Sequence, residues 1–215
     1  MVCCYGLFAA SPKKILIGVA GGTGAGKSTL AQKIHEAFPS NSVLLSQDFY
    51  YKPLTHLPVE ERAKTNFDHP DSLDFSLMRQ QLLALKNNQP IERPVYNFRC
   101  HQREEETRTV EPADIIIVEG ILLFAVPEIA NLFDLKFFID ADEDVRLLRR
   151  IGRDLNERAR SFESVQAQYL KTVKPMHELF VEPSKKEADM IVPHGGENLV
   201  ALDLIVSRLS DLLKK

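Results

Sequence analysis

The chain contains few cysteines and no long apolar run, and each shortage excludes a class of protein. Three of its 215 residues are cysteine (Cys3, Cys4 and Cys100), an odd number with two adjacent members. That arrangement forms neither a disulfide framework nor a pattern of zinc ligands. A reducing, cytoplasmic environment is therefore expected. No apolar stretch has the length of a transmembrane helix.

A large excess of charge is also lacking, since 27 basic and 30 acidic residues give a net charge of -3. This balance disfavours nucleic acid or an anionic membrane as the main partner. The apolar run at residues 2–10 does not fit a signal peptide for two reasons. It is too short, and its nearest basic residues, Lys13 and Lys14, follow it where a signal peptide has them before its apolar core. Residues 1–12 are expected to form an N-terminal arm.

What the sequence does contain is an alternation of strand and helix patterns along one domain, residues 1–215. Continuous apolar runs such as ILIGVA and DIIIVE are typical of parallel strands buried on both faces. Strands are predicted at 15–20, 43–45, 114–119, 135–139 and 190–192, and helices at 28–38, 76–85, 143–153 and 199–213. The alternation predicts an α/β fold, a parallel sheet with helices on both faces.

One segment, residues 92–112, departs from this alternation. Val95, Tyr96 and Phe98 precede a charged turn (HQREEE), and Thr107 to Val110 follow it. Two short strands around such a turn predict a β-hairpin inserted into the α/β core.

A phosphate-binding loop follows the first predicted strand. The segment GGTGAGKS fits the pattern G-x-x-x-x-G-K-[ST] and lies between a strand and a helix, which is the context that the motif requires. Its glycines let backbone N–H groups surround phosphate oxygens, and the helix start adds a partial positive charge. The predicted phosphate-binding residues are Gly21, Gly22, Thr23, Gly24, Ala25, Gly26, Lys27, Ser28 and Thr29.

Glu119 ends the DIIIVE strand, at the sheet edge where parallel sheets bind ligands. With a phosphate-binding loop nearby, Ser28 and Glu119 are predicted to manage Mg²⁺; the alternative makes Glu119 a carboxylate that caps a turn. The sequence has no guanine-reading N-K-x-D segment, which disfavours a GTPase switch. The small size favours transfer of a phosphoryl group to a small acceptor.

Asp48 follows the second strand on the same sheet edge. A carboxylate there can accept the proton of an attacking hydroxyl, as the catalytic aspartate of kinases does. Aspartate is equally common as the N-cap of a helix after a strand, and the pattern does not separate the two roles.

Six arginines fall between residues 146 and 160: Arg146, Arg149, Arg150, Arg153, Arg158 and Arg160. The first four share one helical face. Acidic neighbours, among them Asp154, fit a solvated face, whereas the use of arginine without lysine fits bidentate contact with phosphate. Residues 146–165 are predicted to form a lid, with at least two of these arginines functional.

These segments together resemble the uridine–cytidine kinase family. The matching stretches are GGTGAGKST, SQDFYY, NFDHPD, PVYNFRCHQR, ADIIIVEGIL, RRIGRDLNERAR, QYLKTVKPMHE and ADMIVPHGGEN. They run in the family's order from about Lys14 to Leu209, and NFDHPD together with PVYxF and RRxxRDxxERxR is specific. The resemblance implies a P-loop NTPase fold, ATP as phosphate donor, Mg²⁺, a pyrimidine ribonucleoside as acceptor and a tetramer.

The family's roles transfer to matching positions. Asp48 matches the base that activates the 5′-hydroxyl, and Asp68 the carboxylate that binds the ribose hydroxyls. The residues matched to contacts with the nucleoside are Tyr96 and His101 (pyrimidine edge), Tyr51, Phe67 and Phe98 (walls around the pyrimidine ring), and Arg150, Arg160 and Gln168 (further contacts). Arg153 and Arg158 match lid arginines near the phosphates, and Glu197 an acidic residue near the adenosine.

Three positions depart from the family pattern. Asn97 replaces an aspartate in the hairpin, Ala159 a glycine in the lid, and Glu197 an aspartate. The first is expected to alter hydrogen bonding in the hairpin, and the second to stiffen the lid. None removes a group that the chemistry requires.

The expected activity is phosphorylation of uridine or cytidine at the 5′-hydroxyl to give UMP or CMP. One alternative is a related kinase acting on a sugar phosphate, which resembles phosphoribulokinase and needs basic residues in the acceptor pocket. A second alternative, from another class, is a nucleotide-binding regulator without turnover, which the presence of Asp48 disfavours.

Overall fold

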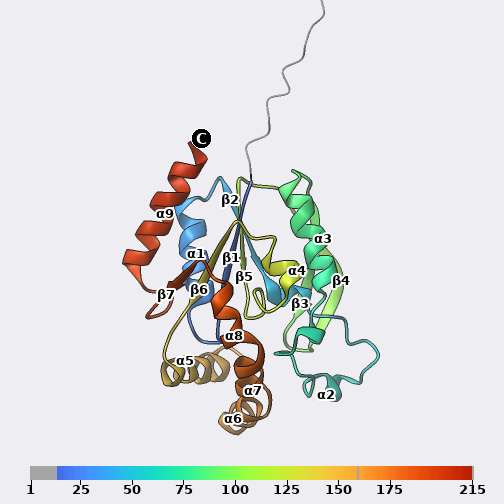
Figure 1. The fold of residues 1–215 in the computed structure, drawn as a ribbon. Coiled ribbons are helices and arrows are strands. Elements are labelled where there is room, and N and C mark those ends of the chain that lie inside the picture. The colour runs from blue at the N-terminus through green and yellow to red at the C-terminus, as the bar shows by residue number, and fades with distance from the viewer. Residues whose placement is uncertain (1–13, 159, 215) are drawn as a thin grey trace, which may run out of the picture.

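The computed structural model describes residues 14–158 and 160–214 (Figure 1). The expected N-terminal arm (residues 1–12), Cys3, Cys4 and Ala159 lie outside the described residues. Cys100 is a free thiol in the turn of the hairpin.

A five-stranded parallel sheet forms the centre of the molecule, as predicted, with the strand order β2-β5-β1-β6-β7. Its strands are β1 (Ile15–Gly21), β2 (Ser42–Ser46), β5 (Ile115–Glu119), β6 (Leu135–Ile139) and β7 (Met190–Val192). Every residue of β1 is buried, because the strand is central and has helices on both sides. This burial explains the continuous apolar run in its sequence.

Two hydrophobic cores lie on opposite faces of the sheet (Figure 1). One core includes residues of α1 (Lys27–Ala37) and α9 (Leu199–Leu213), and the other includes residues of α3 (Phe75–Lys86) and α4 (Pro127–Ala130). Helices on both faces confirm the predicted fold class. Two more helices, α5 (Glu143–Asn156) and the short α2 (Val59–Arg62), lie beyond one end of the sheet. Within the described residues, no helix is both long enough and apolar enough to cross a bilayer.

The hairpin is formed by β3 (Ile91–Asn97) and β4 (Gln102–Val110), which pair antiparallel. The register shifts between Pro94 and Tyr96. A proline has no N–H to donate to a ladder, so an irregularity in the pairing is expected at this point. The hairpin packs beside α3, away from the central sheet.

One helical segment was not predicted, the stretch from Phe162 to Glu187 that continues the chain after α5. It consists of α6 (Phe162–Gln168), α7 (Lys174–Met176) and α8 (Glu182–Ser184), joined by π-helical turns at Tyr169–Val173 and His177–Val181 and followed by a 3₁₀ turn. Pro175 and Pro183 each follow one of the wide turns. Proline disrupts a regular α-helix, and the wider turns accommodate it, so the helical periodicity is hard to see in the sequence.

Candidate functional site

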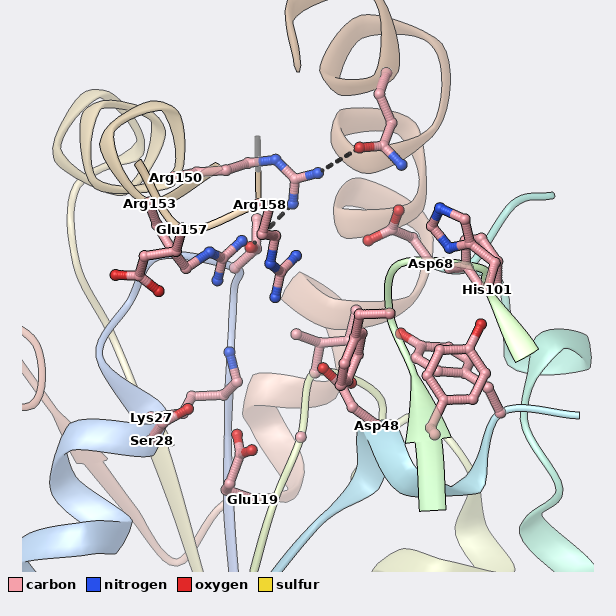
Figure 2. A pocket seen from close by; sticks show the side chains of 18 of the residues that line it. Lys27, Ser28, Asp48, Asp68, His101, Glu119, Arg150, Arg153, Glu157 and Arg158 are labelled. Atoms are coloured by element: carbon pink, nitrogen blue, oxygen red, sulfur yellow. Dashed lines mark hydrogen bonds between the residues drawn. The ribbon is translucent and has the colours of Figure 1, made fainter. Parts of the chain in front are cut away.

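A pocket of about 360 Å³ opens at the carboxyl edge of the sheet and is lined by most of the predicted site residues. Its lining comprises Thr23, Lys27, Ser28, Asp48, Tyr51, Phe67, Asp68, Tyr96, Phe98, His101, Glu119, Gly120, Ile121, Arg150, Arg153, Glu157, Arg158, Arg160 and Gln168. Figure 2 shows the arginines of the α5 region on one side of the pocket and Asp68 and His101 on the other. Residues from distant parts of the chain therefore surround one cavity.

The phosphate-binding loop joins β1 to α1. Gly24 and Gly26 have φ angles of 76° and 100°, in the left-handed region that favours glycine. A side chain on Gly24 would collide with the carbonyl oxygen of Arg146, so α5 packs directly against this loop. The loop is thus fixed in shape by its neighbour as well as by its own turns.

Lys27 begins α1 and is buried, with 8% of its surface exposed. Its ammonium donates to the carbonyl oxygen of Gly22 at 3.0 Å. Burial lowers the pKa of Lys27, and the nearby carboxylates of Glu119 and Asp48 oppose that shift. The loop therefore holds a poorly solvated positive group that faces two carboxylates.

Glu119 lies at the end of β5, where the parallel register places it beside Val19 of β1 and Ser46 of β2. Its carboxylate accepts a hydrogen bond from Ser46 Oγ at 2.6 Å. Burial raises the pKa of Glu119, whereas the positive charge of Lys27 and the nearby hydroxyls of Ser46 and Ser28 lower it. The carboxylate is thus held by the Ser46 hydroxyl next to the phosphate-binding loop.

Asp48 lies in a 3₁₀ turn, Gln47–Tyr50, directly after β2. The N-cap of this turn is Ser46, whose hydroxyl accepts the Asp48 N–H at 3.3 Å. The alternative reading of Asp48 as the N-cap is therefore wrong. The Asp48 carboxylate lines the pocket beside the Tyr51 hydroxyl, whose pKa burial and the Asp48 charge raise. Tyr51, expected only as a ring wall, thus also lies next to Asp48.

An aromatic group lies next to Asp48 in the pocket. Tyr51 lies 5.1 Å from both Phe67 and Tyr96, measured between ring centroids, and Phe67 stacks on His101 at the same distance. The Tyr96 hydroxyl is buried and has no hydrogen-bond partner among the described residues. Since a buried hydroxyl without a partner is costly, this atom indicates a site for a polar ligand atom.

Phe98 occupies a different environment from Tyr96. It follows the end of β3 and is 43% exposed, so the two residues do not share one buried face of the hairpin. Their rings meet edge to face, with centroids 5.1 Å apart. Phe98 therefore contributes to the open side of the pocket.

Asp68 lies on the same side as His101 (Figure 2). Burial raises the pKa of Asp68, and the positive charge of Arg150 and a hydrogen bond from Thr172 oppose the shift. Burial and the charges of Arg160 and Arg158 lower the pKa of His101, which favours the neutral imidazole. Thr172, on the helical segment that was not predicted, is a contact that sequence reasoning missed.

Arg150 connects two sides of the pocket. Its guanidinium donates to Thr23 Oγ1 at 3.1 Å and to Gln168 Oε1 at 2.8 Å (Figure 2). Arg160 donates to the same oxygen of Gln168. The phosphate-binding loop and the helical segment after α5 are thus joined through one arginine.

Asp154 is the main residue that sequence reasoning missed at this site. It is 0% exposed, and its carboxylate lies 2.9 Å from Arg153, 3.6 Å from Arg150 and Arg158, and 3.7 Å from Arg160. Its interpretation as part of a solvated face is therefore wrong. The spacing Arg150–Asp154–Arg158, four residues on each side, is the signal that points to it.

The six arginines occupy two different environments in the structure. Arg146 lies under the phosphate-binding loop, where its guanidinium meets His177 at 3.2 Å, and Arg149 lies against Gly195. Arg150, Arg153, Arg158 and Arg160 line the pocket instead. That at least two of the six are functional stays a prediction, and the helical spacing did not indicate which of them would line the pocket.

Seven predicted residues are not part of the pocket lining: Gly21, Gly22, Gly24, Ala25, Gly26, Thr29 and Glu197. Glu197 forms an ion pair with Lys33 of α1, and the loop beside it packs on Gly26. Thr29 lines a separate groove beside α1 and β2. Asn97 donates to Glu104 at 2.9 Å and accepts from the Arg99 N–H, so the amide adds a bond that an aspartate cannot donate.

Comparison with known proteins adds a second line of evidence. Residues 16–201 match the model of the family described as "Phosphoribulokinase / Uridine kinase family". The chain belongs to this family. A uridine kinase of Clostridium perfringens is 49% identical over 204 residues, which cover 94% of this chain and 98% of that protein. A uridine kinase of Anoxybacillus flavithermus is 48% identical, with 94% and 97% covered.

Solved structures share the fold. A phosphoribulokinase from Rhodobacter spheroides superposes with a TM-score of 0.65 at 14% identity, and the match covers 85% of this chain and 71% of that one. At this identity the likeness supports the fold alone. The predicted resemblance to the uridine kinase family is confirmed by the family model and by the relatives. As a kinase of this family, the chain uses ATP as its phosphate donor.

Proposed function

We propose that this protein transfers the γ-phosphate of ATP to the 5′-hydroxyl of uridine or cytidine and yields UMP or CMP. The observation that carries the proposal is the position of Asp48, which lines one pocket together with Lys27 of the phosphate-binding loop and with the aromatic group around Tyr96. A carboxylate between a phosphate site and an aromatic cavity can bind an acceptor hydroxyl and orient it toward the donor.

The proton of the acceptor hydroxyl moves to Asp48 in this mechanism. Tyr51 lies beside the Asp48 carboxylate, and the acceptor binds with its oxygen in line with the donor phosphate. Lys27 supplies positive charge at the β- and γ-phosphates, and Arg153 and Arg158 supply it from the lid. These groups are preorganised, since Asp154 already holds both arginines.

Mg²⁺ fits the oxygen ligands present. The hydroxyl of Ser28 and the carboxylate of Glu119 both line the pocket beside Lys27, and hard oxygen ligands next to a phosphate site suit this ion. Ser28 and Glu119 would hold it, and when bound it supplies charge that neutralises the phosphate oxygens. Glycines 21, 22, 24 and 26, with Thr23, Ala25 and Thr29, would complete the binding of the triphosphate, and Glu197 would lie on its adenosine side.

The acceptor side suits a pyrimidine ribonucleoside. Tyr51, Phe67 and Phe98 would form walls for a flat base, and the free hydroxyl of Tyr96 and the neutral imidazole of His101 would bind its polar edge. Asp68 would accept hydrogen bonds from the ribose hydroxyls. Arg150, Arg160 and Gln168, already linked to one another, would hold the sugar side of the site closed.

The experiment that tests this proposal is an ADP-release assay with ATP and Mg²⁺ across a panel of nucleosides and sugar phosphates. Uridine and cytidine are expected to be the best acceptors. Preference for a sugar phosphate would support the phosphoribulokinase-like alternative, which the aromatic walls disfavour. No turnover with any acceptor would support a nucleotide-binding regulator. A tetramer and a cytoplasmic location stay predictions from the family resemblance and the composition.

The first prediction concerns Lys27. Replacement with methionine keeps the buried aliphatic stem but removes the charge, so kcat is expected to fall by about 10²–10³-fold for every acceptor. The control is Lys64→Met, which removes an exposed lysine paired with Glu61 and is expected to leave kcat unchanged. Near-normal turnover of Lys27→Met would contradict the role of the loop.

The second prediction concerns the sugar. If Asp68 accepts from both ribose hydroxyls, 2′-deoxycytidine removes one of its two partners, and kcat/KM is expected to fall by roughly 10²–10³-fold relative to cytidine. Asp68→Ala should reduce this ratio strongly, and Asp71→Ala in the same loop should retain it. Equal use of both sugars by the unaltered enzyme would contradict the ribose role and indicate a deoxynucleoside kinase.

A further inference from the structure

Ser46 is a polar residue at the carboxyl end of β2 to which the mechanism above assigns no role. Its hydroxyl donates to Glu119 Oε1 at 2.6 Å and accepts the backbone N–H of Asp48 at 3.3 Å. A serine hydroxyl has one proton to donate and two lone pairs to accept with, so both bonds form together. One oxygen atom therefore contacts both the predicted metal carboxylate and the turn that holds the predicted base.

The sheet brings these groups together. β2 and β5 are parallel neighbours, and Ser46 is the register partner of Glu119. The bond between their side chains ties the ends of two adjacent strands, at the edge where the chain leaves β2 for the Asp48 turn. A shift in either strand would move Glu119 and Asp48 relative to each other.

Ser46 contacts residues of the site but does not line the substrate pocket itself. It lines a separate groove with Lys33, Val43 and Phe49, whereas Glu119 lines both this groove and the substrate pocket. Its effect on the reaction must therefore pass through the residues that it contacts. Groups of this kind orient a metal-binding carboxylate by occupying one of its oxygens, which leaves the other free to face the metal.

We infer that Ser46 is a positioning residue that sets the orientation of the Glu119 carboxylate and its placement relative to Asp48. By donating to Oε1, Ser46 restricts rotation of the Glu119 carboxylate. By accepting the Asp48 N–H as the N-cap of the 3₁₀ turn, it fixes the position of the Asp48 backbone. The inference rests on the proposed function, because it assigns Ser46 to the phosphoryl-transfer site.

The same strand offers a matched control. Ser42 lies at the other end of β2, and its hydroxyl donates to Phe38 O at 2.8 Å and contacts His35 Nδ1 at 2.7 Å. Ser42→Ala thus removes the hydrogen bonds of a serine hydroxyl on the same strand, as Ser46→Ala does, but at the opposite end of the strand from Glu119 and Asp48. A general weakening of β2 would affect both variants, whereas a positioning role affects Ser46 alone.

Two measurements test the inference. The first is kcat with uridine, and the second is the Mg²⁺ concentration that half-saturates the enzyme–ADP complex, which calorimetry measures without turnover. Loss of a partner that orients a metal ligand typically costs about 10–100-fold in metal affinity or activity, and Ser46→Ala is expected to lower kcat and raise the Mg²⁺ midpoint within that range. The KM for uridine should change little. Ser46→Thr keeps the hydroxyl and should restore both quantities, and Ser42→Ala should match the unaltered protein.

Ser46→Cys guards against a folding defect, because it keeps the side-chain size while weakening the hydrogen bonds. Its thermal midpoint should match that of the unaltered protein, and its kcat and Mg²⁺ midpoint should shift in the same direction as for Ser46→Ala. Folded Ser46 variants whose kcat and Mg²⁺ midpoint equal those of Ser42→Ala would overturn the inference. If the unaltered protein phosphorylated no nucleoside, the proposed function would fail, while the Mg²⁺ midpoints would still decide whether Ser46 orients Glu119.

Discussion

Replacing Asp48 with asparagine is expected to lower kcat by about 10²–10⁴-fold, the range that a positioned general base contributes. Asparagine has nearly the same shape, but it cannot take the proton of the acceptor hydroxyl. The turn should survive, because its N-cap is Ser46 and not Asp48. Binding of ATP and of the nucleoside, measured by calorimetry, should change far less than kcat.

Asp71→Asn is the matched control for this experiment. Asp71 also lies in a 3₁₀ turn near its start, but its side chain is 90% exposed. The control should have the kcat of the unaltered protein. Full activity of a normally folded Asp48→Asn variant would limit Asp48 to a structural role and would remove the observation on which the proposed function depends.

Asp154→Asn is expected to lower the free energy of unfolding by about 3–5 kcal/mol, as removal of one partner from a buried ion pair commonly does. The carboxylate is the counter-ion of four arginines, and asparagine leaves their charges uncompensated close to one another. Urea unfolding followed by circular dichroism measures the change. Activity should fall as well, since Arg153 and Arg158 lose the group that orients them.

Asp74→Asn provides the comparison. Asp74 pairs with one arginine, Arg103, at 3.2 Å, and its side chain is only partly buried. It also caps α3 by accepting the N–H of Leu77, a bond that asparagine can replace. This variant should lose only about 0–1 kcal/mol. A loss at Asp154 no larger than at Asp74 would show that the arginines do not depend on a common buried counter-ion.

Local sequence determined the elements whose signal is contained in a short window. The apolar runs of β1 and β5 reflect burial on both faces, and the phosphate-binding loop is recognisable because its glycines and Lys27 must be adjacent in the chain. The hairpin was predicted correctly, but its turn was not: HQREEE was expected to form the turn, whereas residues 102–106 belong to β4 and the turn is residues 98–101. Resemblance to the family added residues such as Asp68 and Gln168, which no local pattern singles out.

The helical segment after α5 shows where this reasoning fails. Pro175 and Pro183 predict interruption, and the structure instead continues through π-helical turns. Packing against the rest of the molecule holds such turns; Val173 and Val181 are each only 3% exposed. The contact of Thr172 with Asp68 follows from this segment and could not be predicted without it.

The sequence by itself determined the parallel sheet, the phosphate-binding loop and most of the residues that line the pocket. Only the tertiary structure decided the work of three polar residues: Ser46 caps the turn in place of Asp48, Asp154 is the buried centre of four arginines, and Arg146 supports the loop from below. The physical reason is the same in each case. The role of a polar side chain depends on whether it is buried and on which distant groups are buried with it, and neither is written in its neighbours along the chain.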